Sequence, residues 1–492
     1  MQNLIERNPD LEFMSRTPHR QRPSGFGALI ISPTRELAEQ IATEARKLTN
    51  KTGIEVRTAV GGVDKRRGLR QIQEGCDILV GTPGRLKDIL SDPHSQVRAP
   101  ALSTLVLDEA DRLLEQGFEL EIKAIQKLLP DKRSVPRQTL LFSATMPQEV
   151  MPIVNATLSH GYDFIRTVRE GEQPTHESVP QKLGVFGGLQ NQMTALVELC
   201  LNKIHDANRD RPFKAIIFFP AIWEVVLGSE VLKRYQRSAP KEQSLTWPRS
   251  TSIMALHSKL PQGVRTRAAE SFKDAKSAVL LATDVAARGM DFPNVTHVIQ
   301  IGLPQSEEHY IHRIGRTARA GKTGEAWLLI WDSERRELRN RLRRMPLQQD
   351  RSLSAFSGDA EGHSSLNLPF EQIHEELCEC YKSVPEEIKL NTYLSNLGVY
   401  SYLPDKQAVV KALNTRATEA WGAEPPPVNP SLARKLGLTR VRELRIEGGD
   451  DRSGWLEPQA STNERLRHRN KFTSHQRGDR VPRARGKVSL RG

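Results

Sequence analysis

The chain has 492 residues, a formal net charge of +13 and four cysteines. This length is enough for two or three domains. The positive balance favours a polyanionic partner, and so few cysteines exclude a disulfide framework and indicate a reducing compartment. Because no apolar run approaches the roughly 18 residues that cross a bilayer, we expect no membrane partner.

The first half of the chain alternates short apolar runs with amphipathic stretches. This alternation predicts strands joined by helices, and hence a mainly parallel sheet. The expected strands are 28–31, 55–60, 78–80, 105–107 and 139–142. A helix is expected over 35–50, because apolar residues recur there at helical spacing.

A second series of strands follows, which predicts a second domain with a mainly parallel sheet. The expected strands are 215–219, 252–256, 278–281, 297–300 and 326–330. Between the two series, residues 166–181 carry prolines and charges without periodicity. We interpret this stretch as a linker between a first domain (1–165) and a second domain (182–345).

Three carboxylates follow the expected strand at 105–107, in the order Asp108-Glu109-Ala110-Asp111. Charged residues at the carboxyl end of a buried strand lie at the sheet edge where open α/β folds bind ligands. Asp108 is in the position that holds Mg²⁺ in phosphoryl-transfer sites, and Glu109 can orient or deprotonate a water. Taken alone, the same residues fit an acidic helix start stabilised by the helix dipole.

Other motifs stand in a fixed order around these carboxylates, and the set resembles the DEAD-box RNA helicases of superfamily 2 over about residues 28 to 330. The motifs are Pro33-Thr34-Arg35-Glu36-Leu37-Ala38, Thr82-Pro83-Gly84-Arg85, Asp108 to Asp111, Ser143-Ala144-Thr145 and His312 to Arg319. The resemblance implies an α/β fold with two RecA-like domains. It also implies ATP-dependent unwinding or remodelling of RNA with ATP and Mg²⁺ as cofactors, and it disfavours a DNA helicase.

The resemblance assigns roles to individual residues. The catalytic set is Asp108, Glu109, Asp111, Ser143, Thr145, His312, Arg316 and Arg319. The set expected to contact the RNA backbone, without reading its sequence, is Pro33, Thr34, Arg35, Gly62, Thr82, Arg85, Gln262, Arg265, Thr283 and Asp284. Gly289 and Asp291 are expected at the ribose end of ATP, and Asp108 is expected to hold Mg²⁺ through ATP.

The resemblance implies two further details of the site, and spacing bears on the first. Arg316 and Arg319 are three residues apart, so on a helix they share one face, from which they would meet the γ-phosphate of ATP across the interdomain cleft. The alternative is ordinary helix surface charge. The hydroxyls of Ser143 and Thr145 can bond to the carboxylates of the Asp108–Asp111 motif, although a Ser/Thr turn after a strand is the plainer interpretation.

The P-loop Gly-x-x-x-x-Gly-Lys-Ser/Thr is not found before Ala28, nor is the adenine-reading glutamine motif. Gly321-Lys322-Thr323 does not replace the P-loop, because Arg316 stands where its first glycine would be. We therefore expect the chain to begin after the P-loop, and the first sheet to show a gap where a central strand belongs. An incomplete gene start is the favoured explanation, and a catalytically inactive RNA-binding remnant is the alternative.

Beyond the second domain we expect a helical extension (365–447) and a basic disordered tail (448–492). Helices are expected over 385–397 and 405–421, and four tyrosines of this region form either a core, which we favour, or a stacking surface. Residues 461–492 hold ten Lys/Arg and two Asp/Glu, which suits an electrostatic RNA tether or a solvated tail. This arrangement resembles the fungal mitochondrial DEAD-box RNA chaperones. It implies a monomer in the mitochondrial matrix, with the nucleus, nucleolus or cytoplasm as alternatives.

Overall fold

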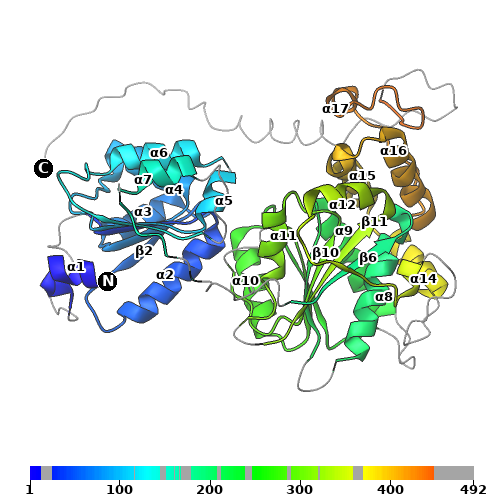
Figure 1. Cartoon of the computed structure of the whole chain (residues 1–492), viewed down its shortest axis with the longest axis horizontal. Coiled ribbons are helices and arrows are strands. Elements are labelled where there is room, and N and C mark those ends of the chain that lie inside the picture. The colour runs from blue at the N-terminus through cyan, green and yellow to red at the C-terminus, as the bar shows by residue number, and fades with distance from the viewer. Residues whose placement is uncertain are drawn as a thin grey trace, which may run out of the picture.

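The fold consists of two α/β domains and a helical region packed on the second of them (Figure 1). The computed structural model describes residues 1–12, 25–115, 117–143, 151–159, 161–165, 167, 179–207, 212–238, 247–284, 290–319, 322–357 and 370–447. The basic tail and most of the expected linker lie outside these residues. None of the described helices has the length and apolar character needed to cross a membrane.

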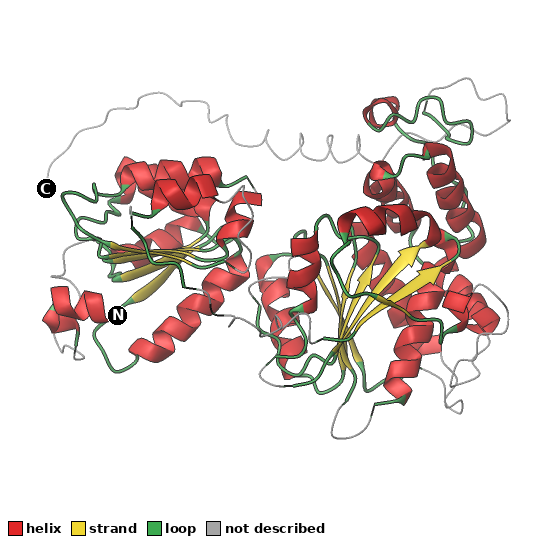
Figure 2. Cartoon of the chain, viewed as in Figure 1, coloured by secondary structure: helices red, strands yellow, loops and turns green. Residues whose placement is uncertain are grey.

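In the described part of the first domain, the sheet has five strands in the order β2-β3-β1-β4-β5, and all neighbours are parallel. The strands are β1 (Ala28–Ile31), β2 (Val56–Ala59), β3 (Ile78–Gly81), β4 (Thr104–Leu107) and β5 (Gln138–Leu141). The helices are α1 (Gln2–Arg7), α2 (Arg35–Thr49), α3 (Lys65–Gln73), α4 (Pro83–Ser91), α5 (Ala110–Glu115), α6 (Glu119–Leu128) and α7 (Met151–Thr157). Figure 2 shows helices on both faces of this sheet, so both faces are buried, as a parallel sheet requires.

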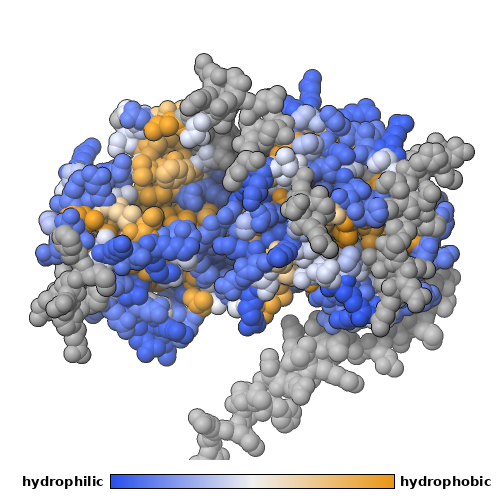
Figure 3. Space-filling model, turned by 90° about the horizontal axis from the view of Figure 1, so that it is seen from below, coloured by the Kyte–Doolittle hydropathy of each residue, from blue (hydrophilic) through white to orange (hydrophobic). Residues whose placement is uncertain are grey.

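The expected gap in the first sheet was wrong. β1 pairs with β3 on one side and with β4 on the other, and β4 pairs with β5, so the five strands form one continuous ladder. β5 is therefore an edge strand, and Phe142 directly after it is 54% exposed. Figure 3 shows a broad hydrophobic area on the half of the molecule that holds this domain.

The second domain has a sheet of seven described strands in the order β12-β6-β11-β10-β7-β9-β8, again parallel throughout. The strands are β6 (Gln181–Phe186), β7 (Lys214–Phe218), β8 (Ser252–Leu256), β9 (Ala278–Ala282), β10 (His297–Ile301), β11 (Glu325–Trp331) and β12 (Gln348–Gln349). The helices are α8 (Gln192–His205), α9 (Ile222–Ser238), α10 (Gln262–Asp274), α11 (Glu307–Ile314), α12 (Arg335–Arg341) and α13 (Ser354–Ser357). β6 was not expected, and it begins inside the range interpreted as a linker.

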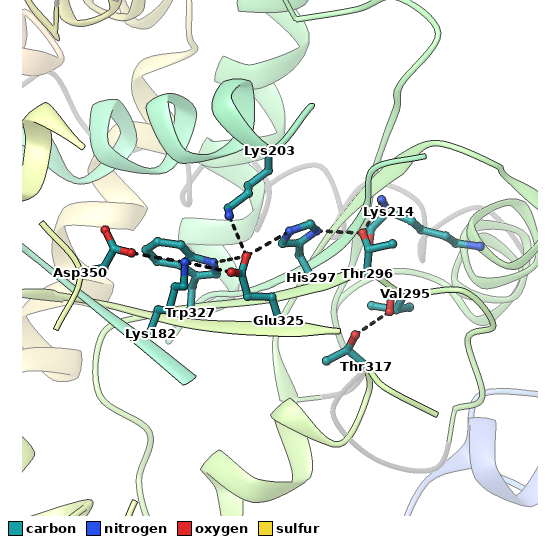
Figure 4. Close-up of polar contacts among 10 residues, drawn as sticks. All are labelled: Lys182, Lys203, Lys214, Val295, Thr296, His297, Thr317, Glu325, Trp327 and Asp350. Carbon is teal, nitrogen blue, oxygen red and sulfur yellow. Dashed lines mark hydrogen bonds and ion pairs between the residues drawn. The ribbon is translucent and has the colours of Figure 1, made fainter. Parts of the chain in front are cut away.

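A polar network joins the amino ends of strands in this second sheet, at the edge opposite to the motifs (Figure 4). Glu325 accepts from Lys182 at 3.0 Å, from Lys203 at 2.8 Å and from the indole N–H of Trp327 at 3.0 Å. His297 lies 3.3 Å from the same carboxylate. Burial alone would raise the pKa of Glu325, but these partners outweigh it and hold that pKa well below its usual range.

The helical extension shares one hydrophobic core with the second domain. Its helices are α14 (Phe370–Lys382), α15 (Glu386–Val399), α16 (Lys406–Thr415), continued by a π-helix (Arg416–Ala420), and α17 (Pro430–Lys435). A single buried cluster runs from Phe186 to Leu444 and includes side chains of α8, α9, α14, α15 and α16. Tyr381, Tyr393 and Tyr400 are at most 2% exposed, so three of the four tyrosines form part of a core as predicted, and the fourth, Tyr402, is partly buried against it.

Candidate active site

The carboxylate motif lies at the carboxyl end of β4, at the junction with α5. Glu109 adopts a left-handed backbone conformation (φ +48°), which costs a side-chain-bearing residue about 1–2 kcal/mol. This conformation turns the chain sharply from strand to helix, so that Asp108, Glu109 and Asp111 all stay near the sheet edge. Burial raises the pKa of Asp108, and the nearby carboxylate of Asp111 adds to this effect. A cation beside Asp108 would relieve both penalties.

Asp111 forms one of the contacts between the two domains. Its carboxylate Oδ2 lies 3.0 Å from Nε2 of His312, which comes from α11 of the second domain, and their side chains are 0% and 7% exposed. The backbone N–H of Asp111 donates to Oγ of Ser143 at 3.3 Å, so the serine after β5 lies beside the motif. Three predicted catalytic residues are thus brought together from three elements. Thr145 lies outside the described residues.

The motif at 33–38 positions Arg35 at the start of α2. Oγ1 of Thr34 caps this helix by accepting from the backbone N–H of Leu37 at 3.3 Å, and Pro33 is buried. The guanidinium of Arg35 lies against Gly61 and Gly62: a Cβ on Gly62 would come within 2.1 Å of Arg35 Nη1. Gly62 also has φ +76°. The glycine pair is therefore needed here for a side chain to approach the backbone, and it brings two predicted RNA contacts together.

The second predicted RNA motif starts α4. Thr82 is its N-cap residue, and its backbone N–H donates to the carbonyl of Ala59 at 3.1 Å. Arg85 lies in the first turn and donates to the carbonyl of Val63 at 3.3 Å. Because β2 and β3 are neighbours, this loop and the Gly61-Gly62 turn leave the sheet at the same edge. The predicted RNA contacts of the first domain therefore share one edge of the sheet.

Two predicted RNA contacts of the second domain instead face the first domain. Arg265 on α10 lies 2.5 Å from Glu36 on α2, and the two side chains are 7% and 9% exposed. Gln262 donates to the same Glu36 carboxylate at 3.2 Å. An RNA phosphate would have to displace Glu36 to reach Arg265. Sequence reasoning passed over Glu36, although it stands inside the motif beside Arg35.

Thr283 and Asp284 follow β9, as expected. Asp284 accepts from Nε of Arg313 at 2.7 Å and lies 3.6 Å from Nδ1 of His309. Burial alone would raise the pKa of Asp284, but Arg313 and His309 hold it well below its usual range. Arg313 is 3% exposed, so this ion pair fixes the loop after β9 onto α11. Sequence reasoning did not single out Arg313, because its role depends on a partner in another loop.

The expectation that Arg316 and Arg319 share a helix face was wrong. α11 ends at Ile314, and both arginines lie in the turn beyond it. The turn includes Ala318 in a left-handed backbone conformation (φ +54°). The hydroxyl of Thr317 donates to the carbonyl of Val295 at 2.5 Å, and this bond holds the turn against the loop that precedes β10. Both side chains still point toward one loop, because Arg316 donates to the carbonyl of Met290 at 2.6 Å and Arg319 pairs with Asp291 at 2.8 Å.

Asp291 also touches the first domain: its backbone N–H donates to Oε1 of Gln40 at 3.2 Å. Gln40 is one helical turn beyond Glu36 on α2, so this helix meets the second domain along one face. That i,i+4 pair of polar residues was the available sequence signal for this contact. Gly289, the other residue expected near ATP, lies outside the described residues.

The described residues contain no group of three or more His, Cys, Asp or Glu side chains placed to hold a metal ion.

Comparisons with known proteins agree with the geometry. The DEAD/DEAH box helicase family matches residues 11–153, and the helicase conserved C-terminal domain matches residues 192–321. The chain is 45% identical over 455 residues to the mitochondrial ATP-dependent RNA helicase mss116 of Aspergillus fumigatus, an alignment that covers 90% of this chain and 68% of that protein. It is 44% identical to the mitochondrial ATP-dependent RNA helicase cyt-19 of Neurospora crassa, with 91% and 70% covered.

A solved structure of Mss116p bound to single-stranded RNA and AMP-PNP superposes with a TM-score of 0.70 at 29% identity, covering 87% of this chain and 83% of that one. The same helicase bound to single-stranded RNA and UDP-BeF gives an equal score. The chain belongs to the DEAD-box family of ATP-dependent RNA helicases. These relatives favour an enzyme over a non-catalytic RNA-binding remnant.

Proposed function

We propose that the chain remodels RNA by closing its two domains around ATP, Mg²⁺ and a single RNA strand, and by opening them after hydrolysis. The contact between Asp111 and His312 carries this proposal. It joins the carboxylate motif of one sheet to the arginine-bearing segment of the other through two buried side chains. A signal at the nucleotide can thus be passed from one domain to the other through a two-state interface.

In this mechanism Asp108 would hold Mg²⁺, which would neutralise phosphate charge, and Glu109 orients the attacking water. Arg316 and Arg319 stabilise the charge that develops at the γ-phosphate. Arg319 is available for this role, because its pair with Asp291 is partly exposed (35% and 57%), so a phosphate can replace that partner. A bound ATP would supply the free energy of the cycle.

Residues at the carboxyl edges of both sheets hold the RNA backbone. Pro33, Thr34, Arg35, Gly62, Thr82 and Arg85 form the part on the first domain. Gln262, Arg265, Thr283 and Asp284 form the part on the second domain, where Arg265 exchanges Glu36 for a phosphate. Phosphate contacts carry no base information, so binding is independent of RNA sequence. The names of the fungal relatives support a mitochondrial location, and we propose that the chain acts as a monomer.

The test separates chemistry from RNA binding. Arg319→Ala and Arg85→Gln are prepared in the protein. Arg319→Ala should lower RNA-stimulated ATP turnover by a factor of about 10³ to 10⁵ with little change in RNA affinity. Arg85→Gln should weaken RNA binding, and it should leave turnover at saturating RNA nearly unchanged. Equal losses of turnover and affinity in both variants would contradict the assigned roles.

A further inference from the structure

A tryptophan and a lysine meet at the carboxyl edge of the second sheet, beside the proposed RNA contacts but outside every motif considered above. Trp223 lies in the first turn of α9, which follows β7, and Lys259 lies in the loop after β8. The Nζ atom of Lys259 is 4.7 Å from the centroid of the Trp223 ring. This distance is that of a cation–π contact.

The sheet order places this pair across the end of β9. The strands run in the order β7-β9-β8, and their last residues Phe218, Ala282 and Leu256 are in register. The loops after β7 and β8 therefore flank the loop after β9, which begins with Thr283 and Asp284. If these two residues face RNA, as the proposed function states, the strand also passes Trp223 and Lys259.

Exposure distinguishes Trp223 from the other described tryptophans. Trp247, Trp327, Trp331 and Trp421 are at most 5% exposed, whereas Trp223 is partly exposed and Lys259 is exposed. A partly exposed indole has a large apolar face that can still gain contacts with a ligand.

The helical extension holds the backbone of Trp223 in place. The hydroxyl oxygen of Thr392 on α15 lies 3.1 Å from the carbonyl of Trp223 and 2.7 Å from the carbonyl of Ile388. The next residue, Glu224, is buried and forms an ion pair with Arg416 at 2.5 Å. Because the backbone is fixed from behind, the ring loses little conformational freedom when it binds a ligand.

We propose that Trp223 and Lys259 form a binding site for one unpaired nucleotide of the RNA strand, in which Trp223 stacks on the base and Lys259 contacts the adjacent phosphate. A phosphate carries a full charge and attracts an ammonium more strongly than an aromatic face does. An incoming strand therefore draws Lys259 from the ring to the backbone and leaves the indole face to the base. Every base has a π-face, so the site is indifferent to sequence, but it requires a base that is not paired.

Intrinsic fluorescence tests the stacking directly. The full chain carries Trp455→Phe, because that tryptophan lies outside the described residues. Two ligands are titrated: a ten-nucleotide oligouridylate and a ribose-phosphate oligomer of the same length without bases. We expect the oligouridylate to quench tryptophan emission, the abasic oligomer to bind with little quenching, and Trp223→Phe to remove most of the quenching.

Affinity measurements with labelled RNA compare a set of matched variants. Trp223→Ala should weaken binding of single strands by about 5- to 150-fold without changing the salt dependence, and Trp223→Phe should retain most of the affinity. Lys259→Gln should instead reduce the slope of log K against log salt by about 0.7.

RNA binding by the parent chain, with no base-dependent quenching and an unchanged affinity of Trp223→Ala, would overturn this site and leave the proposed function standing. Failure of the parent chain to bind any RNA would overturn the proposed function itself. The comparison of the two ligands needs no Trp223 variant, so a folding defect in Trp223→Ala would not prevent a decision.

Discussion

The second domain contacts the first domain through polar side chains, whereas it contacts the helical extension through a continuous apolar core. Each hydrophobic cluster of the first domain's described residues stays within that domain, and in the described part of the chain the polar contacts to the second domain come from Asp111, Glu36 and Gln40. The extension, in contrast, buries tyrosine and leucine side chains in the core of the second domain. Polar contacts can exchange partners with water, RNA or nucleotide, but an apolar core cannot open without a large loss of free energy.

This contrast between the two interfaces indicates which parts of the molecule move. We infer that the second domain and the extension move as one body and that the first domain closes onto this body. One buried ion pair, Arg416 with Glu224, lies inside the interface that does not open, with side chains 1% and 2% exposed. The pair of Arg265 with Glu36, inside the interface that opens, is less completely buried.

The largest expected effect is on the fixed interface. Glu224→Gln or Arg416→Met should each lower the free energy of unfolding by about 3–5 kcal/mol, because each leaves one buried charge without its partner. The double variant should lose much less unfolding free energy than the two single variants lose together. Urea unfolding followed by tryptophan emission measures this, since Trp421 lies 5.0 Å from the Arg416 guanidinium. The exposed pair of Arg445 and Glu424 is the control, for which single variants should cost less than about 1 kcal/mol.

The interface that opens should respond differently. His312→Ala removes a buried hydrogen bond to a carboxylate, worth about 1.5–3 kcal/mol, so it should reduce the ratio of closed to open molecules by about 10- to 150-fold. The free energy of unfolding of either domain should barely change. Small-angle scattering reports the ratio, and Lys123→Gln on the exposed face of α6 is the control. A large loss of unfolding stability in His312→Ala would mean that the two domains form one folding unit.

The smallest effect concerns the Glu325 network, which lies wholly within the second domain. The pKa of Glu325 is lower in the folded chain than the ordinary glutamate value of about 4.3. Ionised Glu325 therefore stabilises the folded state fully at a pH above about 4.3, and this stabilisation declines as the pH falls below that value. Glu325→Gln should therefore lower unfolding stability by about 1–2 kcal/mol at pH 7, and the difference from the parent should shrink toward pH 3. Domain closure should not change. A difference that is constant with pH would exclude the ionised network as the cause.

Much of the fold could be predicted because apolar periodicity is local. Residues 28–31 and 252–256 are strands with the expected bounds, and the motif carboxylates lie at the expected sheet edge. β6 was missed because Gly184 and the glycines after Phe186 weaken its strand pattern. The order of the strands, and hence the unbroken first sheet, depends on pairings between distant segments, which no local pattern reveals.

The candidate site was likewise predictable only where its features depend on local sequence. The family resemblance singled out Asp111 and His312, which the structure brings together, but it did not indicate that Arg265, expected at the RNA backbone, would pair with Glu36. The helix expected to carry Arg316 and Arg319 ends early, because the tertiary bond of Thr317 to Val295 redirects the chain. Contacts across an interface of two domains depend on how the domains meet, which the sequence of either domain alone does not specify.

The most direct test of the two-body account is a pair of fluorescence energy-transfer distances in the full chain. One dye pair joins exposed positions on the first and second domains, Leu120 and Arg249, and the other joins the second domain and the extension, Arg249 and Glu387. We expect rising salt to lower the transfer efficiency of the first pair, because it weakens polar contacts, and single-stranded RNA to shift that efficiency as well. The second pair should keep a constant efficiency in both titrations. A second pair that changes with the first, or a first pair that responds to neither salt nor RNA, would contradict the account.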